Sequence, residues 1–335
     1  KGIVHDVSDS RATVFIEPWA TVELGNSWRE LKAEEEHEVE RILRELSRSI
    51  GEQRQAISQD VALLAQIDLA RAKARYAERA KATEPVLALR QAQDTAAEDT
   101  ESKDGHILRL VDARHPLLKG KVVPLTVEIG RDFTIMVVTG PNTGGKTVAL
   151  KTIGLLTAMT QAGIPIPAAE TSRIPVFDGI FADIGDEQSI ERALSTFSWH
   201  MGNIVRILSS ATKNSLVLLD ELGSSTDPNE GSALARAILM HLLSQGVMTV
   251  TTTHHSDLKV FAHVTPGLQN ASLDFDPATL SPTYRLSVGY PGGSNAMAIA
   301  SQLGLPAAII DQAKTMLSPS TQQLETLLSD IARDR

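Results

Sequence analysis

The sequence predicts an α/β fold with a mostly parallel sheet, preceded by long helices and followed by a helical tail. After Gly105, short β-branched and apolar runs alternate with helical patterns, which is typical of a parallel sheet flanked by helices. Before that point, apolar residues recur at the spacing of a helix face, and the same spacing returns near the end of the chain. These observations predict three parts, at residues 1–105, 106–293 and 294–335.

The first part is predicted to open with a hairpin and to continue as helix. Residues 2–18 contain two β-rich runs around a cluster of turn-forming residues. Helical spacing then covers residues 39–50, Gly51 marks an expected break, and a second helix is predicted through residues 61–82. Between residues 41 and 90 the sequence has ten basic and six acidic side chains. We favour a solvated helical arm, and a phosphate-contacting face is the alternative interpretation.

The second part contains the predicted sheet. Residues 91–104 lack periodicity and are predicted to form a loop or a domain boundary. Strands are predicted from β-branched and apolar content, and helices from their periodicity and their terminal glycine or proline residues. The predicted strands cover residues 134–139, 215–219 and 247–253, and the predicted helices cover 146–161, 232–244, 295–303 and 306–317.

The composition indicates a globular chain and excludes several classes of protein. Of the 335 residues, 42% are hydrophobic and 22% are charged, which argues against intrinsic disorder. No apolar run approaches the roughly 18 residues that span a membrane, and no secretory leader is expected. The lack of cysteine excludes disulfides, thiolate zinc sites and a cysteine nucleophile, and it fits a cytoplasmic location. The net charge of −9 argues against a uniformly basic nucleic-acid binder, so such binding would need a local basic patch.

A glycine-rich motif lies between a predicted strand and a predicted helix. Residues 140–147 match the pattern G-x-x-x-x-G-K-[ST], whose glycines let backbone amides curl around phosphate oxygens at a helix start. Lys146 would bring positive charge to the β- and γ-phosphates, and the Thr147 hydroxyl would ligate Mg²⁺. The motif predicts a nucleotide site formed by Gly140, Pro141, Asn142, Thr143, Gly144, Gly145, Lys146 and Thr147.

An apolar run of strand length, Leu216–Leu219, is followed directly by Asp220 and Glu221. Open α/β sheets bind ligands at the carboxyl ends of their strands, where these acids would lie. Asp220 suits the coordination shell of Mg²⁺, and Glu221 suits a general base that orients an attacking water. The alternative is a strand that merely ends in polar residues.

Two further segments carry candidate site residues. His254 and His255 follow the predicted strand 247–253, and because strand neighbours face opposite sides, at most one of them is expected to face a nucleotide. Ser195 and Thr196 stand at the start of a helical pattern, and either of them is predicted to cap that helix, whose start would attract phosphate. For both segments an ordinary structural role is the simpler interpretation.

These motifs, in this order, resemble the ATPase core of the MutS family, and above all its bacterial type-two branch. The resemblance covers nearly the whole chain. It implies an ABC-type ATPase domain with a P-loop, preceded by a lever region of long helices and followed by C-terminal dimerisation helices. The segments that carry it are GPNTGGKT, DIGDEQS, STFSWHM, LVLLDELGSSTDP, TTTHHSDLK and the N-terminal HDVSDSRATVFIEP.

The resemblance also implies roles for single residues. Asp220 and Glu221 would be the Walker B pair that follows the Walker A loop at 140–147, and His254 rather than His255 would be the switch histidine. Ser195 would be the signature serine that reaches the γ-phosphate held by a partner subunit. Val123 and Pro124, chosen from their position alone, are candidates for packing on the adenine base.

The sequence departs from the family pattern in two respects. Ser225 stands where the type-two branch usually has glycine, so the loop after the acidic pair is expected to be stiffer. The small MutS-related nuclease domain that full-length type-two proteins carry does not occur here, so we expect no nuclease activity from this chain.

The resemblance predicts an ATPase that binds ATP and Mg²⁺, forms a homodimer and clamps branched DNA to suppress homologous recombination. A ribosome-associated factor that contacts rRNA and splits stalled ribosomes is one alternative, and a scaffold that binds ATP without cleaving it is another. A transporter subunit would carry LSGGQ, which does not occur. A chromosome-cohesion head would separate its two nucleotide motifs by a very long coiled coil, whereas Lys146 and Asp220 are 74 residues apart.

Overall fold

The computed structural model describes residues 1–88, 106–120, 122–140, 144–185, 196–224, 226–276, 281–290, 297, 300–301 and 303–316. The chain divides into two compact units, residues 1–72 and 73–335, with the division inside the helix α2 (Arg54–Ala80). The predicted division at 105 and 293 followed changes in sequence pattern and stays a prediction.

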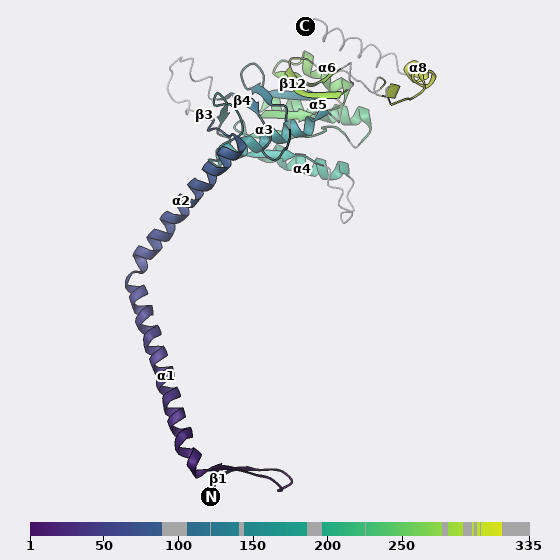
Figure 1. Ribbon diagram of the computed structural model, residues 1–335. Coiled ribbons are helices and arrows are strands. Elements are labelled where there is room, and N and C mark those ends of the chain that lie inside the picture. The colour runs from purple at the N-terminus through teal and green to yellow at the C-terminus, as the bar shows by residue number, and fades with distance from the viewer. Residues whose placement is uncertain are drawn as a thin grey trace. The chain divides into compact units, whose positions relative to one another are not determined.

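The first unit consists of a hairpin and long helices, as the sequence predicts (Figure 1). Strands β1 (Gly2–Val7) and β2 (Val14–Pro18) pair antiparallel, and α1 (Trp19–Glu52) follows directly. The expected break lies at Gln53, two residues after the predicted position, and α2 begins at once. Neither long helix buries a residue among those described, so the predicted apolar stripe of α1 is exposed.

The second unit is built on a six-stranded sheet in which neighbouring strands are parallel, except for the antiparallel pair formed by residues 268–276 and 281–288 at one edge. The three predicted strands are confirmed and form its middle, and the other three were not predicted. In spatial order the strands are β12 (Ser281–Val288), β11 (Leu268–Asp276), β6 (Ile135–Thr139), β10 (Met248–Thr252), β9 (Leu216–Leu219) and β8 (Ile180–Asp183).

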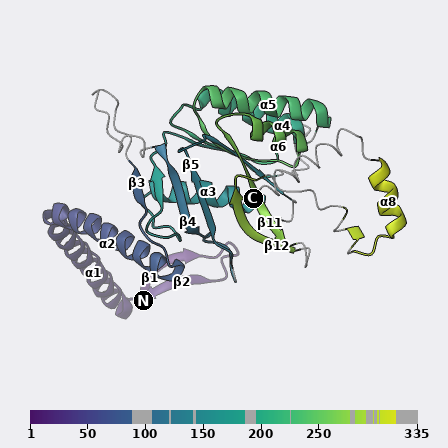
Figure 2. The same cartoon turned by 90° about the horizontal axis from the view of Figure 1, so that it is seen from above.

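Helices cover both faces of this sheet (Figure 2). One face packs against α3 (Lys146–Gln161), whose predicted bounds are confirmed. The opposite face packs against α4 (Thr196–Ser210), α5 (Pro228–Ser244) and α6 (Ser256–Val264). Near the end of the chain, α8 (Ala307–Met316) agrees with the predicted second tail helix. Most of the first predicted tail helix, 295–303, lies outside the described residues.

Period-two alternation along the central strand separates the two cores. On β6, Met136 and Val138 join the cluster that contains α3, whereas Ile135 and Val137 join the cluster formed with α4, α5 and α6. A strand buried on both faces explains why this segment is an unbroken apolar run in the sequence. The central strand is therefore held rigidly, and it delivers its carboxyl end to the turn before α3.

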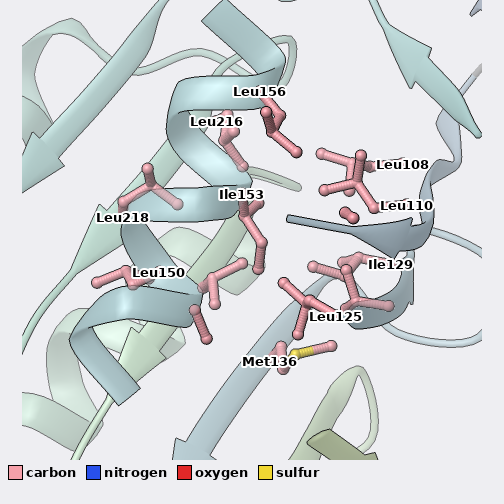
Figure 3. Close-up of a cluster of buried hydrophobic side chains, with 14 of the residues drawn as sticks. Leu108, Leu110, Leu125, Ile129, Met136, Leu150, Ile153, Leu156, Leu216 and Leu218 are labelled. Atoms are coloured by element: carbon pink, nitrogen blue, oxygen red, sulfur yellow. The ribbon is translucent and has the colours of Figure 1, made fainter. Parts of the chain in front are cut away.

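A second, four-stranded sheet packs on the outer side of α3 and was not predicted. Figure 3 shows Leu108, Leu110 and Ile129 of this sheet facing Ile153 and Leu156 of α3. All five side chains are fully buried. In spatial order the strands are β3 (Val86–Ala88), β7 (Arg173–Pro175), β4 (Leu108–Ala113) and β5 (Leu125–Ile129).

Within the described part of the chain, no helix is both long enough and apolar enough to cross a bilayer. This agrees with the sequence, in which no apolar run approaches the roughly 18 residues that a membrane span needs.

Candidate functional site

The turn from β6 into α3 has the backbone geometry that its glycines permit. Gly140 has φ 128°, and Gly145, the residue that caps α3, has φ 89°. Residues other than glycine rarely adopt such backbone angles. The first amides of α3 have no partner within their helix and carry its positive dipole end. Pro141, Asn142 and Thr143 lie outside the described residues. The described ends of the turn form a backbone suited to an anion.

Lys146, the first residue of α3, lies buried at this turn. Its side chain is 3% exposed, and Nζ donates a hydrogen bond of 2.6 Å to the carbonyl oxygen of Gly140. Burial lowers the pKa of Lys146, and the carboxylates of Glu221 and Asp220 oppose that shift. The ammonium is thus placed at the turn and within electrostatic reach of the acidic pair.

The acidic pair follows β9, at the same sheet edge as the glycine turn. A single hydroxyl on the neighbouring strand β10 holds both acids, because Thr252 Oγ1 donates to Asp220 Oδ1 and accepts the Glu221 amide at 2.8 Å. Thr252 is fully buried and Asp220 nearly so. Glu221 has φ 48°, a left-handed conformation that is strained for a residue other than glycine. The strain sits on the residue that the sequence predicts to be the general base.

The side chains at this edge fit a magnesium ion bound together with phosphate. Mg²⁺ takes oxygen ligands and commonly binds through one or two carboxylates, phosphate oxygens and water. Asp220 uses Oδ1 for Thr252, and its other carboxylate oxygen has no hydrogen bond to the described residues. Thr147 is half-buried in the first turn of α3. Among the described residues no three acidic, histidine or cysteine side chains gather as a metal cluster, so phosphate oxygens would have to complete the shell.

The two histidines do not face opposite sides. The strand ends at Thr252, so its alternation stops, and the rings of His254 and His255 stack with centroids 4.5 Å apart. His255 is the capping residue of α6, and its Nε2 lies 3.2 Å from the carbonyl oxygen of Gly223. Burial and then the charge of His255 lower the pKa of His254, whereas Glu221 raises it. His254 therefore lies within electrostatic reach of the predicted base.

Sequence reasoning missed a polar link between α4 and the acidic strand. The carboxylate of Asp183, 2% exposed at the end of β8, accepts from Asn203 Nδ2 at 2.9 Å and lies 2.8 Å from His200 Nδ1. The carbonyl oxygen of Asp183 also accepts the amide of Asp220 at 2.8 Å. One residue thus ties α4 to the acidic pair. The signal was an acid at a strand end inside DIGDEQS. Ser195, directly before α4, lies outside the described residues, as does Ser225.

A hollow of about 360 Å³ lies beside the glycine turn. Val123 lines it, as its predicted role requires, whereas Pro124 is not one of the lining residues. Two ring-bearing side chains that line it, His115 and Tyr284, were not predicted. A Cβ placed on Gly145 would meet Tyr284 Cδ1 at 3.2 Å, so the ring lies against the start of α3. The lining is mostly apolar with a few polar groups, which is typical of a small-molecule site.

Comparison with known proteins gives the family. The family model for MutS domain V matches residues 136–321, which include β6, the glycine turn, the acidic pair and the histidines. The chain therefore belongs to the MutS family and carries its ATPase domain. The relatives described next carry the name of its type-two branch.

Three relatives named Endonuclease MutS2 illustrate the similarity. The protein of Caldanaerobacter subterraneus subsp. tengcongensis is 51% identical over 100% of this chain, that of Thermomicrobium roseum 54% over 99%, and that of Bacillus velezensis 50% over 100%. The chain spans 41% of the length of the first and third of these relatives and 42% of the second.

Proposed function

We propose that this chain binds and hydrolyses ATP at the edge of the sheet where β6, β9 and β10 end. One observation carries the proposal: the buried ammonium of Lys146 lies at a glycine turn, within electrostatic reach of Asp220 and Glu221. A cation, a helix start and two carboxylates at one edge are what a magnesium nucleotide needs for binding and for attack by water.

The α3 start would receive the phosphates. Its amides and the Lys146 ammonium would bind the β- and γ-phosphate oxygens, with Nζ exchanging its bond to Gly140 for phosphate. Thr147 and Asp220 are the residues that would hold Mg²⁺, which when bound supplies positive charge to the phosphate oxygens. Asp220 is held for this task by Thr252.

Glu221 would orient the attacking water and accept its proton. Its amide donates to the Thr252 hydroxyl, so the backbone that positions the carboxylate cannot move without breaking a partly buried hydrogen bond. His254, with a lowered pKa, is neutral at pH 7 and would act as a hydrogen-bonding group at the γ-phosphate rather than as a charge. The reaction is in-line displacement at the γ-phosphorus.

The hollow beside the turn would take the adenine base. It adjoins Gly144 and Gly145 and offers Val123, Tyr284 and His115 as packing surfaces. Burial and the charge of Lys151 lower the pKa of His115, which keeps its ring neutral beside a neutral base. Aromatic and imidazole rings stack favourably on a base.

A second copy of the chain would close the site. The turn and the acidic pair cover a nucleotide from one side only, and a closed site needs a further donor at the γ-phosphate. Ser195, the residue before α4, is the proposed donor from a two-fold partner. Asp183 connects α4 to Asp220 through its hydrogen bonds. A movement of α4 when one site closes would therefore shift the acidic pair of the same chain.

The ATP-driven dimer would act on branched DNA as a clamp that suppresses recombination. The support is family membership and the name Endonuclease MutS2 of the relatives. Binding of four-way DNA junctions, in competition with ribosomes and with or without ATP, tests this target directly. Preference for ribosomes would redirect the proposal to a ribosome-associated role.

Two substitutions test the ATPase itself. Lys146→Ala should abolish tight ATP binding, whereas Glu221→Gln should keep binding and lose roughly 10²–10⁴-fold in turnover. Lys213→Ala and Glu230→Gln remove the same charges at exposed positions and serve as matched controls. Phosphate release from concentrated protein is the assay. Unchanged turnover in Glu221→Gln would remove Glu221 as the base, and no turnover in the unaltered chain would favour a scaffold that binds ATP without cleaving it.

A further inference from the structure

His255 lies beside the proposed nucleotide site, and the mechanism above gives it no role. It is the residue before α6 and its backbone caps that helix, but its side chain makes no capping hydrogen bond. Serine, threonine, aspartate and asparagine are the side chains that favour a cap. The imidazole at this position is therefore explained by what its ring contacts rather than by the start of the helix.

The edge of the His255 ring contacts the turn that follows the acidic pair. Its Nε2 lies 3.2 Å from the carbonyl oxygen of Gly223. A carbonyl oxygen only accepts hydrogen bonds, so Nε2 carries a hydrogen and donates it. The same oxygen faces α5, because a Cβ placed on Gly231 would lie 2.1 Å from it. The Gly223 carbonyl is thus held between α5 and the imidazole.

This turn carries backbone strain that neighbouring contacts must maintain. Glu221 and Gly223 have positive φ values of 48° and 87°, and the amide of Ser224 closes the turn with a hydrogen bond of 3.0 Å to the carbonyl oxygen of Glu221. A strained residue other than glycine persists only where its surroundings fix it. Thr252 fixes the first half of the turn, because it accepts the amides of Glu221 and of the next residue. His255 fixes the second half.

The face of the same ring supports His254. The two rings stack with centroids 4.5 Å apart and an angle of 29° between their planes. His254 is exposed, and exposed side chains change rotamer rapidly unless a neighbour restricts them. A hydrogen bond uses the edge of an imidazole and stacking uses its face, so one ring makes both contacts at once. His255 therefore links the turn after Glu221 to the ring of His254.

We propose that His255 is a positioning residue for ATP hydrolysis. It holds the turn that orients Glu221 and the ring of His254 in one arrangement, so that the base and the group at the γ-phosphate keep a fixed relation to each other. It acts through these two groups rather than by touching the nucleotide. This inference rests on the proposed ATPase function, whereas the two contacts of the ring can be tested without ATP.

Two substitutions separate the two contacts. His255→Phe keeps a flat ring that can stack on His254 but loses the N–H donor, whereas His255→Gln keeps an amide N–H of similar reach but loses the ring. His263→Phe and His263→Gln make the same changes at an exposed position near the end of α6 and serve as matched controls. Phosphate release with Mg²⁺ and ATP gives kcat and KM for each variant of the whole chain.

Turnover should fall while nucleotide affinity stays. Loss of the hydrogen bond to Gly223 should lower kcat by about two- to tenfold in His255→Phe. His255→Gln should lose less, because it keeps the donor, and both His263 variants should match the unaltered chain. KM should change by less than about twofold, since His255 orients the reacting groups without binding the phosphates. A kcat of His255→Phe equal to that of His263→Phe, or a KM that rises as far as kcat falls, would overturn the proposal.

Two measurements without ATP test the ring contacts themselves. At about pH 8.5, where imidazole side chains are ordinarily neutral, ¹⁵N NMR should find the hydrogen of His255 on Nε2. Hydrogen exchange of the Ser224 amide should be about two- to tenfold faster in His255→Phe and unchanged in His255→Gln.

The hydrogen on Nδ1 instead, or equal exchange in the Phe variants of His255 and His263, would overturn the proposal whatever the turnover. Should His255→Phe fail to fold, the NMR result on the unaltered chain and the lowered kcat of His255→Gln still decide it. If the unaltered chain releases no phosphate, the ATPase function fails first, which is a different result from equal turnover in the His255 and His263 variants.

Discussion

Thr252→Val should destabilise the fold and slow ATP hydrolysis together. The Thr252 hydroxyl is fully buried at the end of β10, donates to Asp220 Oδ1 and accepts the amide of Glu221 at 2.8 Å. Valine has nearly the same shape, so the substitution replaces the hydroxyl by a methyl group and leaves no cavity. Both acids then lose the group that positions them.

The magnitude follows from the two hydrogen bonds. A bond to an ionised carboxylate contributes about 1.5–3 kcal/mol and a bond from a backbone amide about 0.5–1.5 kcal/mol, so unfolding free energy should fall by about 2–4.5 kcal/mol. Thr252→Ser keeps the hydroxyl and loses one methyl group, which costs about 0.8 kcal/mol. The serine variant is therefore the matched control.

Urea denaturation measures the stability change, and phosphate release with Mg²⁺ and ATP measures turnover. Each 1.4 kcal/mol of lost transition-state stabilisation corresponds to about tenfold in rate, so a loss of one to two orders of magnitude is expected for valine and little for serine. If valine matches serine in both assays, the Thr252 hydroxyl does not hold the acidic pair and the reasoning is refuted.

Three other substitutions test neighbouring features. Gly231→Ala would place a Cβ 2.1 Å from the carbonyl oxygen of Gly223, so it should push the loop after the acidic pair away from α5. The free energy of unfolding, measured by urea denaturation, should fall by about 1–3 kcal/mol. Stability equal to that of the unaltered chain would contradict this. Tyr284→Ala should raise the Kd for ATP by several-fold and leave the affinity for inorganic triphosphate unchanged, measured by calorimetry, because in the proposed placement only the base would contact the hollow that Tyr284 lines. Because burial lowers the pKa of His254 and Glu221 raises it, Glu221→Gln should lower that pKa further, as followed by NMR of ¹³C-labelled histidine. An unchanged pKa of His254 would show that the two side chains are not coupled.

The parts of the fold that the sequence predicts are those with a strong local pattern. The strand before the glycine turn is apolar from Ile135 to Val138, as a strand buried on both faces requires, and the helix after it begins where a glycine with positive φ can cap it. Helix α5 begins at Pro228 rather than at 232, because Asp227 caps it through hydrogen bonds to the amides of Asn229 and Glu230. The capping signal, Asp227 followed by Pro228, stands in the sequence at the end of LVLLDELGSSTDP.

The rest of the fold depends on contacts between distant segments. Strands β3 and β7 have three residues each, too few for a period to show, and they exist because the chain brings them beside β4. Likewise nothing local marks Thr252 as the anchor of Asp220, since that contact requires β10 to lie beside β9. The alternation argument does not apply to the histidines, because β10 ends at Thr252, before His254. That at most one of them faces a nucleotide stays a prediction.

The central claim is that the turn between β6 and α3 binds a triphosphate, with Lys146 contacting its phosphates. Calorimetry of the whole chain with Mg²⁺ and a non-hydrolysable ATP analogue tests it most directly. The account predicts saturable binding of one nucleotide per chain and its loss in Lys146→Ala, with Lys213→Ala binding like the unaltered chain. Absence of saturable binding, or equal binding by Lys146→Ala, would contradict it.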